Sequence, residues 1–241
     1  MSFNNQYRVG GFGGLPVVTK NIIIINVIVF IMSMLAQSRG VDLTAYLGLH
    51  YYLAPDFRPH QFITYTFMHG SISHIFFNML GIYVFGQALE QVWGPKRYLI
   101  FYIVTGLGAA LAQYVMMHFQ AREIIDWYNA RIEMPEATHD IISQLIDNKF
   151  SDLNRLVVVG ASGSLFGLLG AFGMLFPNRE IYIYFFPVKA KWLVIGYGAM
   201  ELFSGSRNDP MDNVAHFAHL GGLFIGLILV FIWRKDRTHF Y

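Results

Sequence analysis

The stretch that says most about how this chain folds is the apolar run at residues 160–176, Gly-Ala-Ser-Gly-Ser-Leu-Phe-Gly-Leu-Leu-Gly-Ala-Phe-Gly-Met-Leu-Phe. The run contains no charged residue, and glycines recur along it at intervals of three or four positions. Small residues at such spacing let neighbouring membrane helices approach each other closely. We therefore expect residues 160–176 to form a membrane-spanning helix that packs tightly against its neighbours.

Five more apolar stretches have a similar character. A spanning helix needs about 20 mostly apolar residues, with some latitude for tilt. Hydrophobic residues make up 55% of the chain and charged residues only 13%, whereas soluble domains carry about 25% charged residues. The sequence therefore predicts an all-α membrane protein built as a bundle of six transmembrane helices. The predicted spans are residues 20–37, 70–92, 96–118, 160–176, 189–203 and 213–233.

The distribution of charge orients this bundle. Short loops and tails on one side are basic, whereas most acidic residues lie on the other side. The positive-inside rule then places both termini in the cytoplasm. The absence of an Arg- and Ser-rich leader favours a bacterial cytoplasmic membrane.

The apolar spans and the polar segments between them divide the chain into regions. We expect a cytoplasmic segment at 1–19, a membrane domain at 20–233 and a cytoplasmic tail at 234–241. Within the membrane domain, residues 119–155 form a polar extracytoplasmic insert. Its apolar positions fall at helical spacing on either side of Met134-Pro135, which predicts two surface helices.

Composition excludes several classes of function. The chain has no cysteine, which rules out disulfides and thiolate chemistry. A net charge of +2 without any basic run gives no indication of a nucleic-acid partner. The histidines that could in principle hold zinc are His69, His74, His216 and His219. No His-Glu-x-x-His motif is present and no acid pairs naturally with these histidines, so we expect no metal and no cofactor.

Several polar side chains fall inside predicted spans, where they are costly unless they face a cavity or a partner. Ser162 opens the fourth span, and His219 lies near the start of the sixth. Histidine can take the proton of a serine hydroxyl and so make it a nucleophile. His74 and Asn78 share one face of the second span and can donate to an oxyanion. Free backbone amides at the start of the fourth helix, including that of Gly163, can add further donors.

The sequence also predicts where three further side chains lie relative to Ser162 and His219. Phe166 lies one turn after the serine, where its ring can stack on the imidazole of the base. His216 could reach a face similar to that of His219 but lacks the following glycines, so we place it at the cavity mouth. Glu201, late in the fifth span, is expected to face the aqueous side or to line a gate formed by this helix and residues 204–213.

Three short motifs carry a resemblance to a known family. They are His-Gly-Ser-Ile-Ser-His-Ile-Phe-Phe-Asn at 69–78, Gly-Ala-Ser-Gly at 160–163 and Ala-His-Leu-Gly-Gly at 218–222. Together they resemble the signature motifs of the rhomboid intramembrane serine proteases, in the right order and on the second, fourth and sixth spans. The resemblance extends over about residues 62–233.

The resemblance implies a six-helix rhomboid-like bundle and a role for each matching residue. Ser162 would be the nucleophile and His219 its base, with no aspartate to complete a triad. His74 and Asn78 would belong to the oxyanion hole. Glu90 matches a structural glutamate that ties helix ends together. Two features depart from the family: His-Gln at 60–61 replaces a frequent Trp-Arg pair, and the insert at 119–155 is long.

The predicted reaction is serine-dependent cleavage of peptide bonds within or next to transmembrane segments, through an acyl-enzyme. The partners would be single-pass or other membrane proteins and the surrounding lipid bilayer. Two alternatives remain open. One is a transporter or channel that uses the polar cavity, and the other is an inactive relative that binds transmembrane helices.

Overall fold

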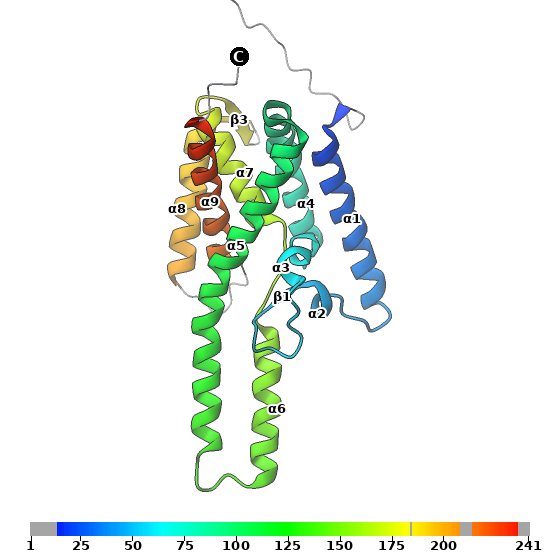
Figure 1. The fold of residues 1–241 in the computed structure, drawn as a ribbon, viewed down its shortest axis with the longest axis vertical. Coiled ribbons are helices and arrows are strands. Elements are labelled where there is room, and N and C mark those ends of the chain that lie inside the picture. The colour runs from blue at the N-terminus through cyan, green and yellow to red at the C-terminus, as the bar shows by residue number, and fades with distance from the viewer. Residues whose placement is uncertain (1–13, 184, 208–213, 236–241) are drawn as a thin grey trace, which may run out of the picture.

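Helices dominate the computed structural model, which describes residues 14–183, 185–207 and 214–235 (Figure 1). Its long helices are α1 (Val17–Gln37), α4 (Ile72–Gly81), α5 (Gln87–Ile132), α6 (His139–Arg155), α7 (Ser162–Leu175), α8 (Ala190–Arg207) and α9 (His216–Lys235). Shorter helical elements are α2 (Thr44–Leu47), α3 (Gln61–Thr64), a 3-10 turn at Tyr65–Phe67 and a π-helical turn at Ile82–Gly86. Two antiparallel strand pairs join β1 (Leu49–His50) to β2 (Val157–Val158), and β3 (Glu180–Ile183) to β4 (Phe186–Lys189).

Length and composition allow several of the described helices to cross a membrane. They are Val17–Gln37, the stretch Ile72–Ile132 and His216–Trp233, with Ser162–Leu175 as a shorter apolar helix. The outward side chains on these helices include large apolar ones, such as Ile28 on α1 and Phe224 on α9. Apolar faces of this kind suit lipid and would be unfavourable in water. The chain is therefore a mostly helical membrane protein, as predicted, and the count of six spans stays a prediction.

A tight turn joins the second and third predicted spans. α4 continues through the π-helical turn into the first residues of α5, and this composite helix ends at Gly94. The φ of Gly94 is 75°, a left-handed conformation that glycine adopts without strain. Pro95 follows, and proline is well suited to the first turn of a new helix. The predicted spans at 70–92 and 96–118 thus lie on either side of this glycine.

The polar insert is a helical hairpin that projects from the bundle (Figure 1). The sequence predicted a separate first surface helix, and this was wrong, because α5 continues unbroken from its membrane part to Ile132. The second predicted surface helix is α6, whose start is capped by the Thr138 hydroxyl. The Tyr128 hydroxyl donates to a carboxylate oxygen of Asp152 at 2.7 Å and joins the two helices. This hydrogen bond raises the pKa of Tyr128 above its usual value.

Helices α7 and α9 pack backbone against backbone. A Cβ added at Gly222 would collide with the carbonyl group of Gly163. One added at Gly226 would lie 2.8 Å from the carbonyl oxygen of Gly167. Only glycine allows this approach, so the glycine spacing of both helices fixes how closely α7 and α9 meet.

The first loop is anchored by a buried glutamine. The side chain of Gln61 is fully buried; its Nε2 donates to the carbonyl of Asp56 at 2.8 Å, and its Oε1 accepts from the Arg58 amide at 3.1 Å. The segment just before α7 is tied to this region, because the amide of Gly160 donates to the carbonyl of Tyr65 at 2.9 Å. Gln61 thus supplies anchoring contacts at a position where the family often has another residue.

Candidate active site

Ser162 and His219 meet where α7 and α9 begin. Ser162 is the first residue of α7, and His219 lies in the first turn of α9. The Nε2 atom of His219 lies 2.7 Å from the Oγ of Ser162. This is an ordinary distance for a hydrogen bond, and the serine hydroxyl can donate its proton to the imidazole. His219 is 9% exposed, so its imidazole is largely shielded from solvent, and Ser162 is half-buried.

The imidazole of His219 is held by an aromatic ring. Phe166 stacks on it with ring centroids 4.3 Å apart and an interplanar angle of 5°. Phe166 is itself buried and contacts Tyr197 of α8 edge to face. The stack sets the plane of the histidine ring. The two ring nitrogen atoms lie on different sides of the ring within that plane.

The side chains of α4 lie on another side of the serine. A Cβ built at Gly160 would be 2.7 Å from Nε2 of His74 and 3.6 Å from Oγ of Ser162, so the His74 ring is close to the hydroxyl. Gly160 has a φ of 124°, which favours glycine and creates room for that ring. Asn78 is 4% exposed, and its Nδ2 has no hydrogen-bond partner among the described residues.

Backbone donors complete the polar surroundings of the hydroxyl. The first amides of a helix have no partner within that helix. Gly163, the second residue of α7, carries one of these amides. A carbonyl oxygen placed beside Ser162 could therefore accept from Gly163 and from the unpartnered amide of Asn78.

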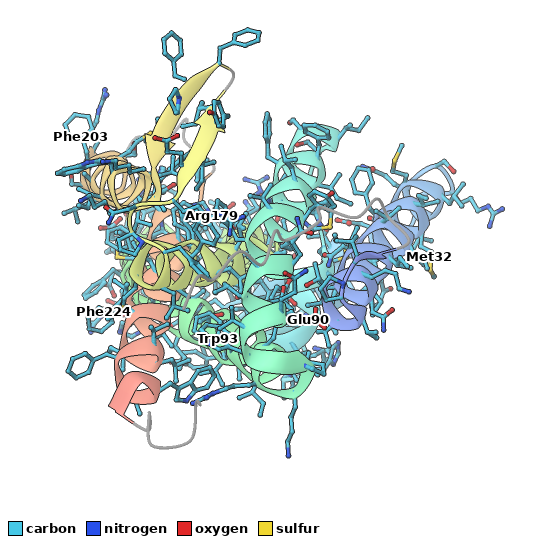
Figure 2. The ribbon with its side chains drawn as sticks, turned by 90° about the horizontal axis from the view of Figure 1, so that it is seen from above. Met32, Glu90, Trp93, Arg179, Phe203 and Phe224 are labelled. Atoms are coloured by element: carbon cyan, nitrogen blue, oxygen red, sulfur yellow. The ribbon has the colours of Figure 1, made fainter. Side chains whose placement is uncertain are left out.

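Glu90 lies beside α1 (Figure 2) and ties α5 to it. Its Oε1 accepts from the amide of Val18 at 2.9 Å, and its Oε2 accepts from the amide and the hydroxyl of Thr19, each at 2.7 Å. These bonds cap the free amides at the start of α1. Glu90 thus connects helix ends and does not contact the serine–histidine pair.

Sequence reasoning missed the contacts of Glu201. The side chain is only 5% exposed and lies against two histidines. Its Oε2 is 2.5 Å from Nδ1 of His216, and its Oε1 is 3.0 Å from Nδ1 of His219. The inference that no acid pairs with these histidines was therefore wrong. An acid inside an apolar helix signals a function by itself, but the sequence does not show which face of α8 meets α9.

One group of described residues has the composition of a metal site. Glu201, His216 and His219 offer ligand atoms that all lie within 4.8 Å of one another. His69 and His74 belong to a different cluster, with their rings 4.9 Å apart. The four histidines considered from the sequence thus do not converge on one point. The absence of a metal remains a prediction.

Comparison with known proteins gives a consistent set of relatives. The model of the Rhomboid domain family matches residues 56–236. The chain is 28% identical to RHOMBOID-like protein 12, mitochondrial, of Arabidopsis thaliana, over 76% of this chain and 49% of that protein. It is 26% identical to Rhomboid-like protein 11, chloroplastic, of the same plant, over 89% and 64%. It is 27% identical to Putative rhomboid protease YdcA of Bacillus subtilis, over 74% and 70%. The chain spans about half to two thirds of the length of these plant relatives.

Proposed function

The chain belongs to the rhomboid family, and from this premise we propose that it is an intramembrane serine endopeptidase. It would cleave peptide bonds within or next to transmembrane segments of other membrane proteins. The observation that supports this most directly is the 2.7 Å contact between the Ser162 hydroxyl and Nε2 of His219. A weak nucleophile and its base are within hydrogen-bond reach, as covalent catalysis by serine needs.

The proposed reaction begins with the neutral imidazole of His219. It takes the proton of Ser162 while Oγ attacks the scissile carbonyl carbon, and the resulting imidazolium then gives that proton to the leaving amine. The amide of Gly163 and the side chains of His74 and Asn78 stabilise the negative oxygen of the intermediate. Water then attacks the acyl-enzyme, with the same imidazole as base, and releases the second product.

Substrates follow from the position of the site in the fold. Ser162 starts a helix that directly follows the projecting hairpin, so the site lies toward the hairpin end of the bundle. A transmembrane substrate must locally unwind before its carbonyl group can reach the hydroxyl. We therefore propose a preference for segments that contain Gly or Pro, because these residues weaken helices.

The protein is a membrane protein, and its particular membrane is part of the proposal. Both termini would face the cytoplasm, in accordance with the basic short loops. Some relatives carry mitochondrial or chloroplastic names and another comes from a bacterium. Our proposal of the bacterial cytoplasmic membrane rests on the sequence. The relatives do not favour it over an organelle membrane.

A serine-reactive probe and a cleavage assay together test the proposed function. Wild-type protein in detergent should react covalently with a fluorophosphonate, and Ser162→Ala and His219→Ala should abolish both labelling and cleavage of co-expressed tagged single-pass proteins. The matched control is Ser164→Ala, because Ser164 lies in the same helix but donates to the carbonyl of Tyr102. Labelling and cleavage that persist in Ser162→Ala would overturn the proposal in favour of a transporter or channel. Cleavage absent from the wild type across the panel would favour a helix-binding inactive relative.

A further inference from the structure

We propose that Glu201 is a positioning residue that turns the serine–histidine pair into a Ser162–His219–Glu201 triad. This inference rests on the proposed serine endopeptidase. It differs from the arrangement implied by the family resemblance, in which no acid orients the histidine.

Burial is the first observation that points to Glu201. The residues beside it on α8, Met200 and Leu202, are 51% and 60% exposed and apolar, and Phe203 lies at the outer edge of the bundle (Figure 2). Glu201 itself is 5% exposed, so it turns inward toward α9. A carboxylate at such a position is costly unless specific partners stabilise it.

The carboxylate divides its two oxygen atoms between two histidines. Oε2 contacts Nδ1 of His216 at 2.5 Å and Oε1 lies 3.0 Å from Nδ1 of His219. The opposite nitrogen of His219, Nε2, contacts the Ser162 hydroxyl. Serine, imidazole and carboxylate therefore follow one another in the order in which a catalytic triad needs them.

This order determines which nitrogen of His219 carries the proton. To accept from Ser162, Nε2 must be unprotonated, so the neutral ring must carry its proton on Nδ1. A carboxylate beside Nδ1 favours that tautomer and stabilises the imidazolium formed after proton transfer. In the structure without substrate, Nδ1 of His219 lies 3.0 Å from Oε1 of Glu201 but does not form a well-aligned hydrogen bond with it. Such bonds often align only when substrate binds.

His216 fixes the carboxylate in place. It lies three residues before His219 on α9, and the centroids of the two rings are 6.5 Å apart. By binding Oε2, it leaves Oε1 as the oxygen that faces His219. The ring faces of the two histidines are nearly perpendicular, which lets one carboxylate serve both Nδ1 atoms.

The same three residues could instead hold zinc, and the geometry disfavours this alternative. Two ligands of a tetrahedral zinc ion with bonds of about 2.0–2.1 Å lie about 3.3 Å apart. The contact between Glu201 and His216 is 2.5 Å, which is shorter than the spacing of two ligands of one ion. Zinc would also take Nδ1 of His219 and leave Glu201 unable to orient a neutral imidazole.

The test compares Glu201→Gln and Glu201→Asp with wild type, using a purified transmembrane substrate. Glu201→Gln should lower kcat about 10²-fold or more and change KM less than about threefold, because the substrate does not contact Glu201. Glu201→Asp should recover part of the lost kcat, since it keeps the charge. Thermal unfolding of each variant separates a positioning role from a folding defect, and exposed Glu180 provides the control Glu180→Gln, with unchanged kcat.

The outcomes separate this inference from the proposed function. If Ser162→Ala is inactive but Glu201→Gln keeps wild-type kcat, the triad is wrong and the serine endopeptidase stands. If Ser162→Ala is fully active, the proposed function itself fails. A loss of kcat in Glu201→Gln that comes with an equal loss of folded protein would overturn the positioning role. A wild-type enzyme that loses kcat in a chelator and regains it with added zinc would replace the triad with a metal site.

Discussion

At the scale of single residues, the imidazole of His219 is constrained by three neighbouring side chains. Ser162 and Phe166 come from α7, and Glu201 comes from α8. A ring that is held in this way cannot rotate without losing one of its contacts. The orientation of this ring therefore depends on how three helices meet, as well as on which residues lie next to it.

Replacing Phe166 by leucine tests the contribution of the stack. Leucine keeps most of the apolar volume but removes the parallel ring, an interaction of about 0.5–1.5 kcal/mol. We expect Phe166→Leu to label with fluorophosphonate about 2- to 10-fold more slowly than wild type. Phe224→Leu is the control, because that ring is 63% exposed on the outside of α9. Equal labelling rates for both variants would show that the stack does not orient the base.

Replacing Asn78 by alanine tests the proposed oxyanion site. The buried Nδ2 of Asn78 has no partner in the described residues, which leaves this donor free to bind a substrate oxygen. Asn78→Ala should lower kcat by about 10²–10³-fold with a smaller change in KM, as loss of an oxyanion donor does. The measurement is steady-state cleavage in detergent. A kcat within threefold of wild type would remove Asn78 from the proposed mechanism.

The motifs made most of these side chains identifiable in the sequence, but not all. Ser162, His219, His74 and Asn78 stand in short patterns whose spacing has a chemical meaning. Glu201 stands in no such pattern. Its inward direction follows from the rotation of α8 against α9, which depends on packing between residues distant in sequence.

At the scale of helices, close packing between α7 and α9 brings serine and histidine together. Gly222→Ala places a methyl group against the carbonyl of Gly163, and overpacking of this kind costs about 1–3 kcal/mol. We expect a lower unfolding temperature and loss of cleavage. Gly196→Ala is the matched control, because a Cβ there meets nothing within 4 Å, and this variant should be as stable as wild type or more stable. Equal stability of the two variants would contradict this account of the packing.

Glu90 is expected to affect folding but not chemistry. Hydrogen bonds to a charged group contribute about 1.5–3 kcal/mol each, and Glu90 accepts three of them from Val18 and Thr19. Glu90→Gln should therefore lower the unfolding temperature, while kcat of the folded fraction stays close to wild type. Glu123→Gln, an exposed change in the projecting hairpin, should alter neither quantity. A lower kcat without any loss of stability would place Glu90 in the catalytic apparatus.

Helical elements were predictable where composition determines them. Apolar length located the segments at 20–37, 160–176 and 213–233 to within a few residues of α1, α7 and α9. It failed at the end of α5, where polarity increases but no glycine or proline interrupts the helix before Pro135. A change from apolar to polar residues marks where a helix leaves the membrane, and it does not mark where the helix ends.

At the scale of the whole molecule, the hairpin and the chain ends give the bundle a direction. α1 begins and α9 ends at the same end of the bundle, and the hairpin of α5 and α6 extends from the opposite end (Figure 1). With a rise of about 1.5 Å per residue, the part of α5 beyond residue 118 extends about 20 Å. The acidic residues of this hairpin match the side that the positive-inside rule leaves outside the cytoplasm.

Protease accessibility tests this orientation. A cleavage site for a specific protease inserted between Met134 and Ala137, at the turn of the hairpin, should be cut when the protease is added outside intact cells with a permeable cell wall. The same site appended after Tyr241 should be protected there and cut only in inverted vesicles. Since the turn contacts neither Ser162 nor His219, the insertion should leave fluorophosphonate labelling unchanged. Cutting of both sites from the same side would mean that the hairpin and the C-terminus share a compartment, and the three spans predicted between them would then be wrong.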